Sequence, residues 1–162
     1  MELDSRPVQL DPELQQSIRV IREAFATVVK EFGLTIDSAP TNPAFIEYKH
    51  LQKMRDNRIP MFGFYHEQQQ IGFAAIEAKL PETFFLERLA VMPQYRHKGV
   101  GRQIIKHMEA YVRGLGGKII RIGVMDNNIV LKAWYQQQGF IEQQITEFPH
   151  LPFAVCYMEK KL

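Results

Sequence analysis

The segment with the clearest chemical potential is LAVMPQYRHKGVGRQII, residues 89–105. An apolar stretch leads through Pro93 to two glycines, Gly99 and Gly101, that stand directly before an amphipathic run. Glycines let a backbone approach a ligand closely, and the free amides at a helix N-terminus attract anions. Formal positive charge comes from Arg96, Lys98 and Arg102. The segment therefore predicts a phosphate-binding loop at the start of a helix.

The glycine spacing argues against two common nucleotide-binding motifs. A Walker loop needs Gly-Lys-Ser/Thr and a dinucleotide-binding fingerprint needs a third glycine, and neither is found here. Two glycines can also simply cap a helix while the surrounding cations stay in water. The loop by itself predicts an anion site without identifying the anion.

A second informative block, NIVLKAWYQQQGF, covers residues 128–140. It predicts a short helix that starts at Asn128 and stops at Gly139, with Tyr135 four residues before the glycine. A phenol can donate a proton to a departing thiolate when the two lie close together. A tyrosine on an amphipathic helix is more often packed beside other aromatic residues, and Trp134 offers such a neighbour. Taken alone, the block allows both interpretations of Tyr135.

The two blocks in this order resemble the GNAT superfamily of N-acetyltransferases. The run Arg96-x-x-Gly99-x-Gly101 after Leu89-Ala90-Val91 is similar to the loop that binds the acyl-CoA pyrophosphate in that superfamily. Residues 128–140 are similar to its later helix, with the Asn, Ala, Tyr and terminal Gly-Phe in matching order. The resemblance is strongest over residues 84–141, and the order of expected elements extends it to about residues 6–160.

The resemblance implies acetyl-CoA as the cofactor and transfer of its acetyl group to a primary amine by direct attack in a ternary complex, without a metal. It implies that the loop holds the pyrophosphate, that the preceding strand holds the pantetheine arm and acyl carbonyl, and that Asn128 bonds the amide-rich arm. Asn128 also reads as an ordinary N-cap, and both roles are compatible. The expected cofactor-binding residues are Leu89, Ala90, Val91, Arg96, His97, Lys98, Gly99, Val100, Gly101, Arg102, Asn128 and Tyr135.

Two residues are predicted to be catalytic. Acetyl transfer to an amine needs a neutral amine, a stabilised oxyanion and a proton for the departing thiolate. The resemblance assigns the thiolate proton to Tyr135, and it allows an acid at the position of Glu87. Because Glu87 interrupts the apolar run FFLERLAVM, it is a candidate for the general base that takes the proton of the incoming amine.

Alternatives for the base are open. Strand period two places Glu87 on the face of Leu89 and away from Arg88, so Arg88 is not expected as its ion-pair partner. A cross-strand cation or an exposed strand edge would equally explain a carboxylate at this position. His97 and His150 are further candidates, the first from the loop and the second from the late part of the chain.

Composition limits the number of domains, the partners and the location that we expect. A length of 162 residues is typical of one domain, and a formal net charge of +2 is too small to predict a nucleic-acid or membrane partner. The single cysteine, Cys156, lies in an apolar run and is expected as buried filler, not as a nucleophile. No stretch has the length of a signal peptide or a membrane span, so we expect a cytoplasmic protein.

Periodicity predicts the elements that position these residues. Apolar stripes at spacings of three and four predict helices from Asp11 to Gly33, with Asp11 as the cap, and from Val100 to Leu115, together with shorter helices at 42–57 and 128–138. Alternation predicts a hairpin whose turn is EQQQ, residues 67–70. The expected strands cover residues 61–66, 71–79, 83–92, 118–125, 140–148 and 153–158.

This order of elements predicts an α/β or α+β fold in a single domain, residues 1–162. The resemblance specifies a central mixed, mostly antiparallel twisted sheet of about six to seven strands with about four helices on both faces. The acceptor is expected to be a small-molecule or peptide amine, and a homodimer formed by a late strand such as 153–158 is the default. The alternative function is a non-catalytic acyl-CoA-binding regulatory module.

Overall fold

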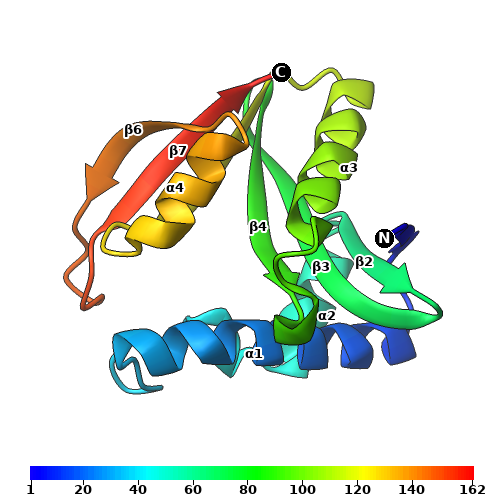
Figure 1. Ribbon diagram of the computed structural model, residues 1–162, viewed down its shortest axis with the longest axis horizontal. Helices are drawn as coiled ribbons and strands as arrows, with labels where there is room; N and C mark the ends of the chain where they lie inside the picture. The colour runs from blue at the N-terminus through cyan, green and yellow to red at the C-terminus, as the bar shows by residue number, and fades with distance from the viewer. The chain divides into compact units, whose positions relative to one another are not determined.

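The computed structural model describes residues 1–162 and contains seven strands and four α-helices (Figure 1). The chain forms two compact units, each built from two stretches of sequence. Unit 1 consists of Met1–Glu77 and Glu87–Ile104, and unit 2 consists of Ala78–Leu86 and Ile105–Leu162. The strands β3 and β4 and the helix α3 run from one unit into the other.

Unit 1 holds the N-terminal half of the chain together with the predicted anion loop. Its strands β1, β2 and β3 pair antiparallel, with Ser5 opposite Phe64 and Phe64 opposite Gly72. The core of the unit includes the fully buried Leu14 and Phe73. Its elements are β1 (Asp4–Pro7), α1 (Asp11–Phe32), the 3-10 turn η1 (Pro43–Phe45), α2 (Tyr48–Asp56), β2 (Met61–His66), most of β3 (Gln69–Leu80), the second half of β4 (Thr83–Val91), the 3-10 turn η2 (Pro93–Tyr95) and the first turn of α3 (Val100–Gly114).

Unit 2 holds the second predicted block. The first half of β4 pairs with β5 in parallel, with Phe84 opposite Ile120, and β7 pairs antiparallel with both β5 and β6. Figure 1 shows β6 and β7 side by side with α4 next to them. Phe140, Cys156 and Met158 are among its fully buried side chains. Besides the rest of α3, the unit contains β5 (Ile119–Met125), α4 (Ile129–Gln137), β6 (Ile141–Thr146) and β7 (Val155–Lys161).

The strand order is β1-β2-β3-β4-β5-β7-β6, and the sheet is mixed because β4 and β5 are parallel. This confirms the predicted α/β architecture, a mixed sheet of about six to seven strands with about four helices. The expectation that residues 153–158 form an exposed edge strand is wrong. Strand β7 is hydrogen-bonded on both sides, so the edge of the sheet in unit 2 is β6.

The long first helix is confirmed, but its predicted cap is not. Helix α1 covers Asp11–Phe32 and ends at Gly33, whose φ of 63° is left-handed. The N-cap is Leu10, whose backbone N–H donates to the Glu13 carboxylate at 2.8 Å. The Asp11 carboxylate is therefore free to accept hydrogen bonds from α2, which local sequence could not show.

Three other local predictions need correction. The helix expected at 42–57 is two pieces, because the chain is extended at Ile46 and Glu47 between η1 and α2. The hairpin turn is shorter than EQQQ, since only Glu67 and Gln68 leave the strands, both with positive φ. Such a two-residue turn matches the twist of the paired strands. Strand β1 was not predicted, because four residues with two charges and a proline carry no alternation.

Candidate active site

The predicted anion loop lies in unit 1 between η2 and α3. His97 and Gly99 both have left-handed backbone conformations, with φ of 61° and 80°. The Arg96 N–H bonds to the Pro93 carbonyl, and the Gln103 N–H bonds to the Gly99 carbonyl. The amides between these two bonds belong to the loop and the first helical turn, where no intrahelical acceptor exists. The backbone thus presents a group of amide donors at the positive end of α3.

The start of α3 is held close to the sheet of unit 1. A Cβ atom at Gly72 would lie 2.8 Å from Ile104 Cδ1 and 3.3 Å from the Ala90 carbonyl oxygen. A side chain here would displace the end of Ile104 and press on the Ala90 carbonyl, so glycine suits this close approach of β3 to α3. Val100 and Ile104 are fully buried, so apolar contacts fix the helix N-terminus beside the end of β4.

The loop fits a diphosphate in charge and in space. No heavy atom lies within 4 Å of the position that a Cβ would take at Gly99, so the backbone here is open. His97, Lys98 and Arg102 are exposed, and the Lys98 ammonium stands 5.5 Å from the centre of the Tyr95 ring. The donor amides, the helix terminus and these cations all favour an anionic ligand.

Arg96 behaves differently from the other cations of the loop. Its guanidinium reaches α1, where it donates to the Ala24 carbonyl at 2.6 Å and to Thr27 Oγ1 at 2.8 Å. Sequence analysis placed Arg96 with the phosphate ligands and gave no signal for Thr27. The partner lies 69 positions away in the sequence, and no local periodicity reports such a contact.

Strand β4 carries an irregularity directly before the predicted pantetheine-binding residues. Arg88 has a φ of 54° in the middle of the strand, a conformation that costs non-glycine residues roughly 1 kcal/mol or more. This breaks the alternation of side chains, so Arg88 Nη1 reaches Glu87 Oε2 at 3.3 Å. The expectation that Arg88 points away from Glu87 is wrong for this reason. Irregular strand positions of this kind often re-aim side chains next to active sites.

Glu87 and the strand residues that follow it lie in unit 1. The Glu87 side chain is 21% exposed and that of Arg88 is 29% exposed, so both charges are partly shielded from water. Ala90 is buried, whereas Leu89 and Val91 are half-buried. The Nε atom of Arg88 is buried without a hydrogen-bond partner. Unit 1 therefore contains Glu87, the Leu89–Val91 strand and the anion loop.

Unit 2 contains the other two predicted residues, Asn128 and Tyr135. Asn128 caps α4, because its side-chain oxygen accepts the Leu131 N–H at 3.2 Å. The Tyr135 ring is buried in edge contacts with Trp134 and Phe140, whose centroids lie 4.9 and 5.4 Å away. Burial raises the pKa of the Tyr135 phenol well above its usual value of 10.0. The phenol is therefore protonated at neutral pH.

A charged cluster at α4 pairs one lysine with two carboxylates. Lys132 Nζ lies 2.7 Å from both Asp126 Oδ1 and Glu142 Oε1, and these bonds raise the pKa of the lysine. Cys156 is fully buried, and its thiol lies 3.4 Å from the Glu142 carboxylate. Burial and that carboxylate raise the pKa of Cys156 to about 11. A thiol that stays protonated is a poor nucleophile, as predicted from its apolar segment.

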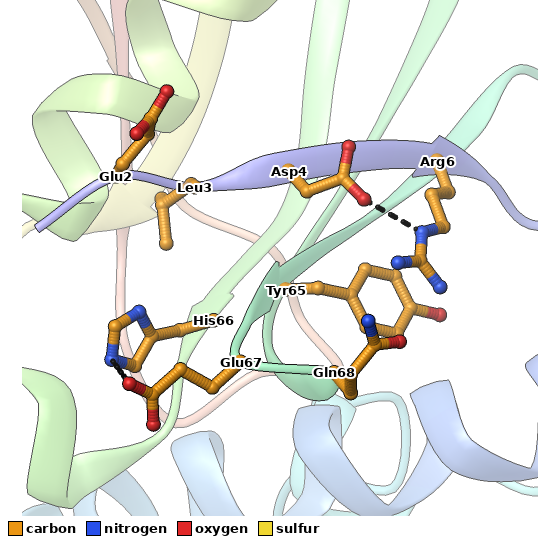
Figure 2. A pocket seen from close by; sticks show the side chains of 8 residues that line it. All are labelled: Glu2, Leu3, Asp4, Arg6, Tyr65, His66, Glu67 and Gln68. Atoms are coloured by element: carbon orange, nitrogen blue, oxygen red, sulfur yellow. Dashed lines mark hydrogen bonds and ion pairs between the residues drawn. The ribbon is translucent and has the colours of Figure 1, made fainter.

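Figure 2 shows a separate open pocket in unit 1, of about 450 Å³. Strand β1 and the β2–β3 turn line it, and Arg6 is bound to Asp4 at 2.8 Å and stacked on the Tyr65 ring. His66 also lines the pocket and meets Tyr95 of η2 edge-on. The pocket contains none of the predicted site residues, and its charged groups are mostly paired with each other.

Comparison with known proteins identifies the family. Residues 24–140 match the sequence model of the acetyltransferase (GNAT) family. The chain belongs to this family. GNAT proteins are acetyl-CoA-dependent acyltransferases, so the chain is an acetyltransferase enzyme with acetyl-CoA as its cosubstrate. The match spans both the loop of unit 1 and the α4 block of unit 2 and ends at Phe140.

Solved GNAT structures share the fold at low sequence identity. The ribosomal-protein-S18-alanine N-acetyltransferase of Escherichia coli is 17% identical, with a TM-score of 0.77 over 99% of this chain and 94% of that chain. The PaiA N-acetyltransferase of Thermoplasma acidophilum, solved with coenzyme A, is 22% identical, with a TM-score of 0.77 and full coverage of both chains. An IAA acetyltransferase of Bacillus cereus is 13% identical, with a TM-score of 0.66 over 99% of this chain and all of that one.

No curated protein matches the chain with significant similarity. Two of the three names, ribosomal-protein-S18-alanine N-acetyltransferase and IAA acetyltransferase, refer to different substrates, so the shared fold does not select one for this chain. None of the helices combines the length and apolar character needed to cross a membrane.

Proposed function

We propose that this GNAT acetyltransferase transfers the acetyl group of acetyl-CoA to a primary amine by direct attack of the amine in a ternary complex. The observation that carries the proposal is the cradle of amide donors at His97–Arg102, with two left-handed residues and open space at Gly99. Bound acetyl-CoA supplies an activated thioester, and the remaining steps are the work of protein groups.

Binding is assigned to unit 1 and to the start of α4. The backbone amides of residues 97–102 hold the diphosphate, and Lys98 and Arg102 add positive charge. The strand Leu89–Val91 lies along the pantetheine arm, and one of its amides donates to the acyl carbonyl oxygen. The Asn128 side chain uses its oxygen for the α4 cap, which leaves its NH₂ group to bond an amide carbonyl of the same arm.

Two proton transfers complete the reaction. The Glu87 carboxylate accepts a proton from the attacking amine, directly or through a water molecule. The Tyr135 phenol donates its proton to the thiolate as the carbon–sulfur bond breaks. A phenol carries a proton at neutral pH, as this role requires.

The acceptor is proposed to be a small-molecule or peptide amine. We propose that residues 1–162 work as a single N-acetyltransferase domain. The comparison with PaiA, whose structure contains coenzyme A, supports a whole-chain coenzyme-binding domain of this length.

Calorimetric titration with acetyl-CoA at moderate salt tests the proposal first, with dephospho-CoA and ATP as controls. Stoichiometric micromolar binding of acetyl-CoA is expected, and dephospho-CoA should bind comparably because it keeps the diphosphate and the pantetheine arm. ATP should bind much more weakly because it lacks the pantetheine arm. Absence of binding at millimolar acetyl-CoA would contradict the proposal.

A screen of amines for thiol release then tests the transfer step. Turnover with at least one amine, lost in Glu87→Gln and Tyr135→Phe, is the expected result. Tight binding of acetyl-CoA without turnover across amino acids, polyamines, aminoglycosides and peptides would favour the non-catalytic binding module instead.

A further inference from the structure

Arg96 joins the coenzyme loop to the middle of α1. Its Nη2 donates to the Ala24 carbonyl at 2.6 Å, and its Nη1 donates to Thr27 Oγ1 at 2.8 Å. Thr27 Oγ1 in turn donates to the same Ala24 carbonyl at 3.0 Å. The three residues form a closed set of hydrogen bonds within unit 1, so the loop cannot shift without breaking or dragging this part of α1.

The partners of Arg96 are neutral, which leaves its charge uncompensated. No carboxylate is paired with the guanidinium, and partial burial lowers its pKa while leaving it a cation at neutral pH. The side chain is therefore fixed in place by hydrogen bonds that do not cancel its charge. Such a cation, carried by a residue of the loop, adds positive potential to it and has no ion-pair partner to release when an anion binds.

Helix α1 is in turn bonded to η1 and α2. Arg22 Nε donates to the Ile46 carbonyl at 2.6 Å, immediately after η1. At the other end of the helix, Asp11 Oδ1 accepts from Tyr48 Oη at 2.8 Å and from Arg55 Nη1 at 2.7 Å. The contacts therefore run without a break from the loop through Arg96 to α1, and from α1 to residues 43–56.

We propose that Arg96 is a positioning residue that couples coenzyme binding to the order of α1, η1 and α2 through Thr27 and the Ala24 carbonyl. The inference rests on the proposed function, because it takes a coenzyme diphosphate as the anion of the loop. Coupling is reciprocal: if coenzyme A orders α1 through this tie, then the tie raises the affinity for coenzyme A by the same factor. The first helices thus become fixed when the acyl donor is bound.

The test uses the full chain and coenzyme A as the probe. Calorimetry gives Kd, and amide hydrogen exchange reports order in residues 20–30 and 43–56. Thr27→Val should weaken coenzyme A binding about three- to fivefold and remove the coenzyme-induced slowing of exchange in residues 20–30. Thr27→Ser keeps the hydroxyl and should restore both. Arg96→Gln should weaken coenzyme A binding about tenfold. The double variant with Thr27→Val should bind coenzyme A only slightly more weakly than Arg96→Gln does, because both substitutions remove the same contact.

Arg19→Gln is the matched control. Arg19 also lies on α1, but it is paired with Glu23 in solvent, so neither Kd nor exchange should change. Urea unfolding of each variant without coenzyme shows whether the fold is retained. Coenzyme-induced slowing at 97–104 but not at 20–30 in the wild-type protein would overturn the coupling.

A second outcome would also overturn the coupling. If Arg96→Gln loses affinity while Thr27→Val binds like the wild type and keeps its slowed exchange, Arg96 acts on the diphosphate directly. Failure of the wild-type protein to bind coenzyme A at all is a different result, because it would overturn the proposed function itself and the coupling with it.

Discussion

The anion loop of unit 1 and the charged cluster of unit 2 differ in how their titratable groups are paired. In unit 1, the loop cations Arg96, Lys98 and Arg102 form no ion pairs, and the backbone around them presents unbonded amides. In unit 2, Lys132 is balanced by Asp126 and Glu142, and burial keeps the Tyr135 phenol and the Cys156 thiol protonated. The two regions differ in whether their charged groups are paired and not in how many charged residues they contain.

The difference predicts separate roles: the loop binds an anion, the Lys132 cluster stabilises the fold, and Tyr135 transfers a proton. Uncompensated cations beside free amides gain most from an incoming anion, because no intramolecular partner has to be released. A cation that is already paired offers no such gain, and Lys132 instead connects α4 with β6 and with the residue that follows β5. Changes to the loop of unit 1 should therefore act on coenzyme affinity, whereas changes to Tyr135 should act on turnover and changes to the Lys132 cluster should act on stability.

The largest expected effect is on turnover and comes from Tyr135→Phe. Loss of the hydroxyl should lower kcat by about 100-fold, a typical contribution of a positioned general acid, with coenzyme A affinity nearly unchanged. Steady-state kinetics together with calorimetry measure the two quantities. Equal kcat in the variant and the wild type would exclude Tyr135 as the acid and leave only its packing role against Phe140.

Gly99→Ala tests the loop of unit 1. Space is available for the new methyl group, so the effect comes from the φ of 80°, which disfavours any L side chain by about 1 kcal/mol. We expect coenzyme A to bind about tenfold more weakly and the melting temperature to fall by a few degrees. Gly114→Ala is the control, because Gly114 lies in α3 with open space and no positive φ. Equal effects of both substitutions would contradict a special role for the loop conformation.

Lys132→Met tests whether the charged cluster of unit 2 is structural. Removing the cation should lower the free energy of unfolding by about 1 kcal/mol at pH 7, a modest value because solvent partly screens the pair. Coenzyme A affinity should not change. Urea unfolding of both proteins measures the stability difference, and a large loss of coenzyme affinity in Lys132→Met would break the distinction between the two regions.

The pH dependence of that difference has a defined sign. Hydrogen bonding to Lys132 holds the pKa of Glu142 below its ordinary value of 4.5. The stabilisation is therefore complete above about pH 4.5 and is lost as the pH falls through the lowered pKa. On the alkaline side it persists past the usual lysine pKa, because the pKa of Lys132 is raised. The stability difference between the wild type and Lys132→Met should shrink as the pH falls from 4.5 through the lowered pKa of Glu142, and a difference that does not shrink over the acidic range in which both proteins stay folded would argue against the ion pair as its cause.

The smallest effect is expected from Cys156→Ala. A thiol with a pKa of about 11 is almost entirely protonated at pH 7.5, so it should not carry an acyl group and should react slowly with iodoacetamide. Turnover should stay within about twofold of the wild type. Accumulation of an acetylated enzyme, seen by intact-protein mass spectrometry and absent in the variant, would instead indicate a covalent route.

Much of the fold was predictable because its signals are local. The stripe of Leu14, Ile18 and Ile21 defined α1, and alternation defined β2, β3 and β5. The strand β1 was missed, since it exists only through its pairing with β2. The hairpin turn and the break between η1 and α2 were misplaced by a few residues, because the chosen turn depends on the strands that it joins.

For the candidate site, the sequence by itself determined which residue types occur where, including the glycines of the loop and the block around Tyr135. These follow from covalent sterics and helix periodicity, which act within a few residues. Only the tertiary structure decided that Arg96 bonds to Thr27 and that Arg88 turns towards Glu87. The first depends on a contact between distant segments, and the second depends on a strained φ within the sheet. Neither produces a periodic pattern in the sequence.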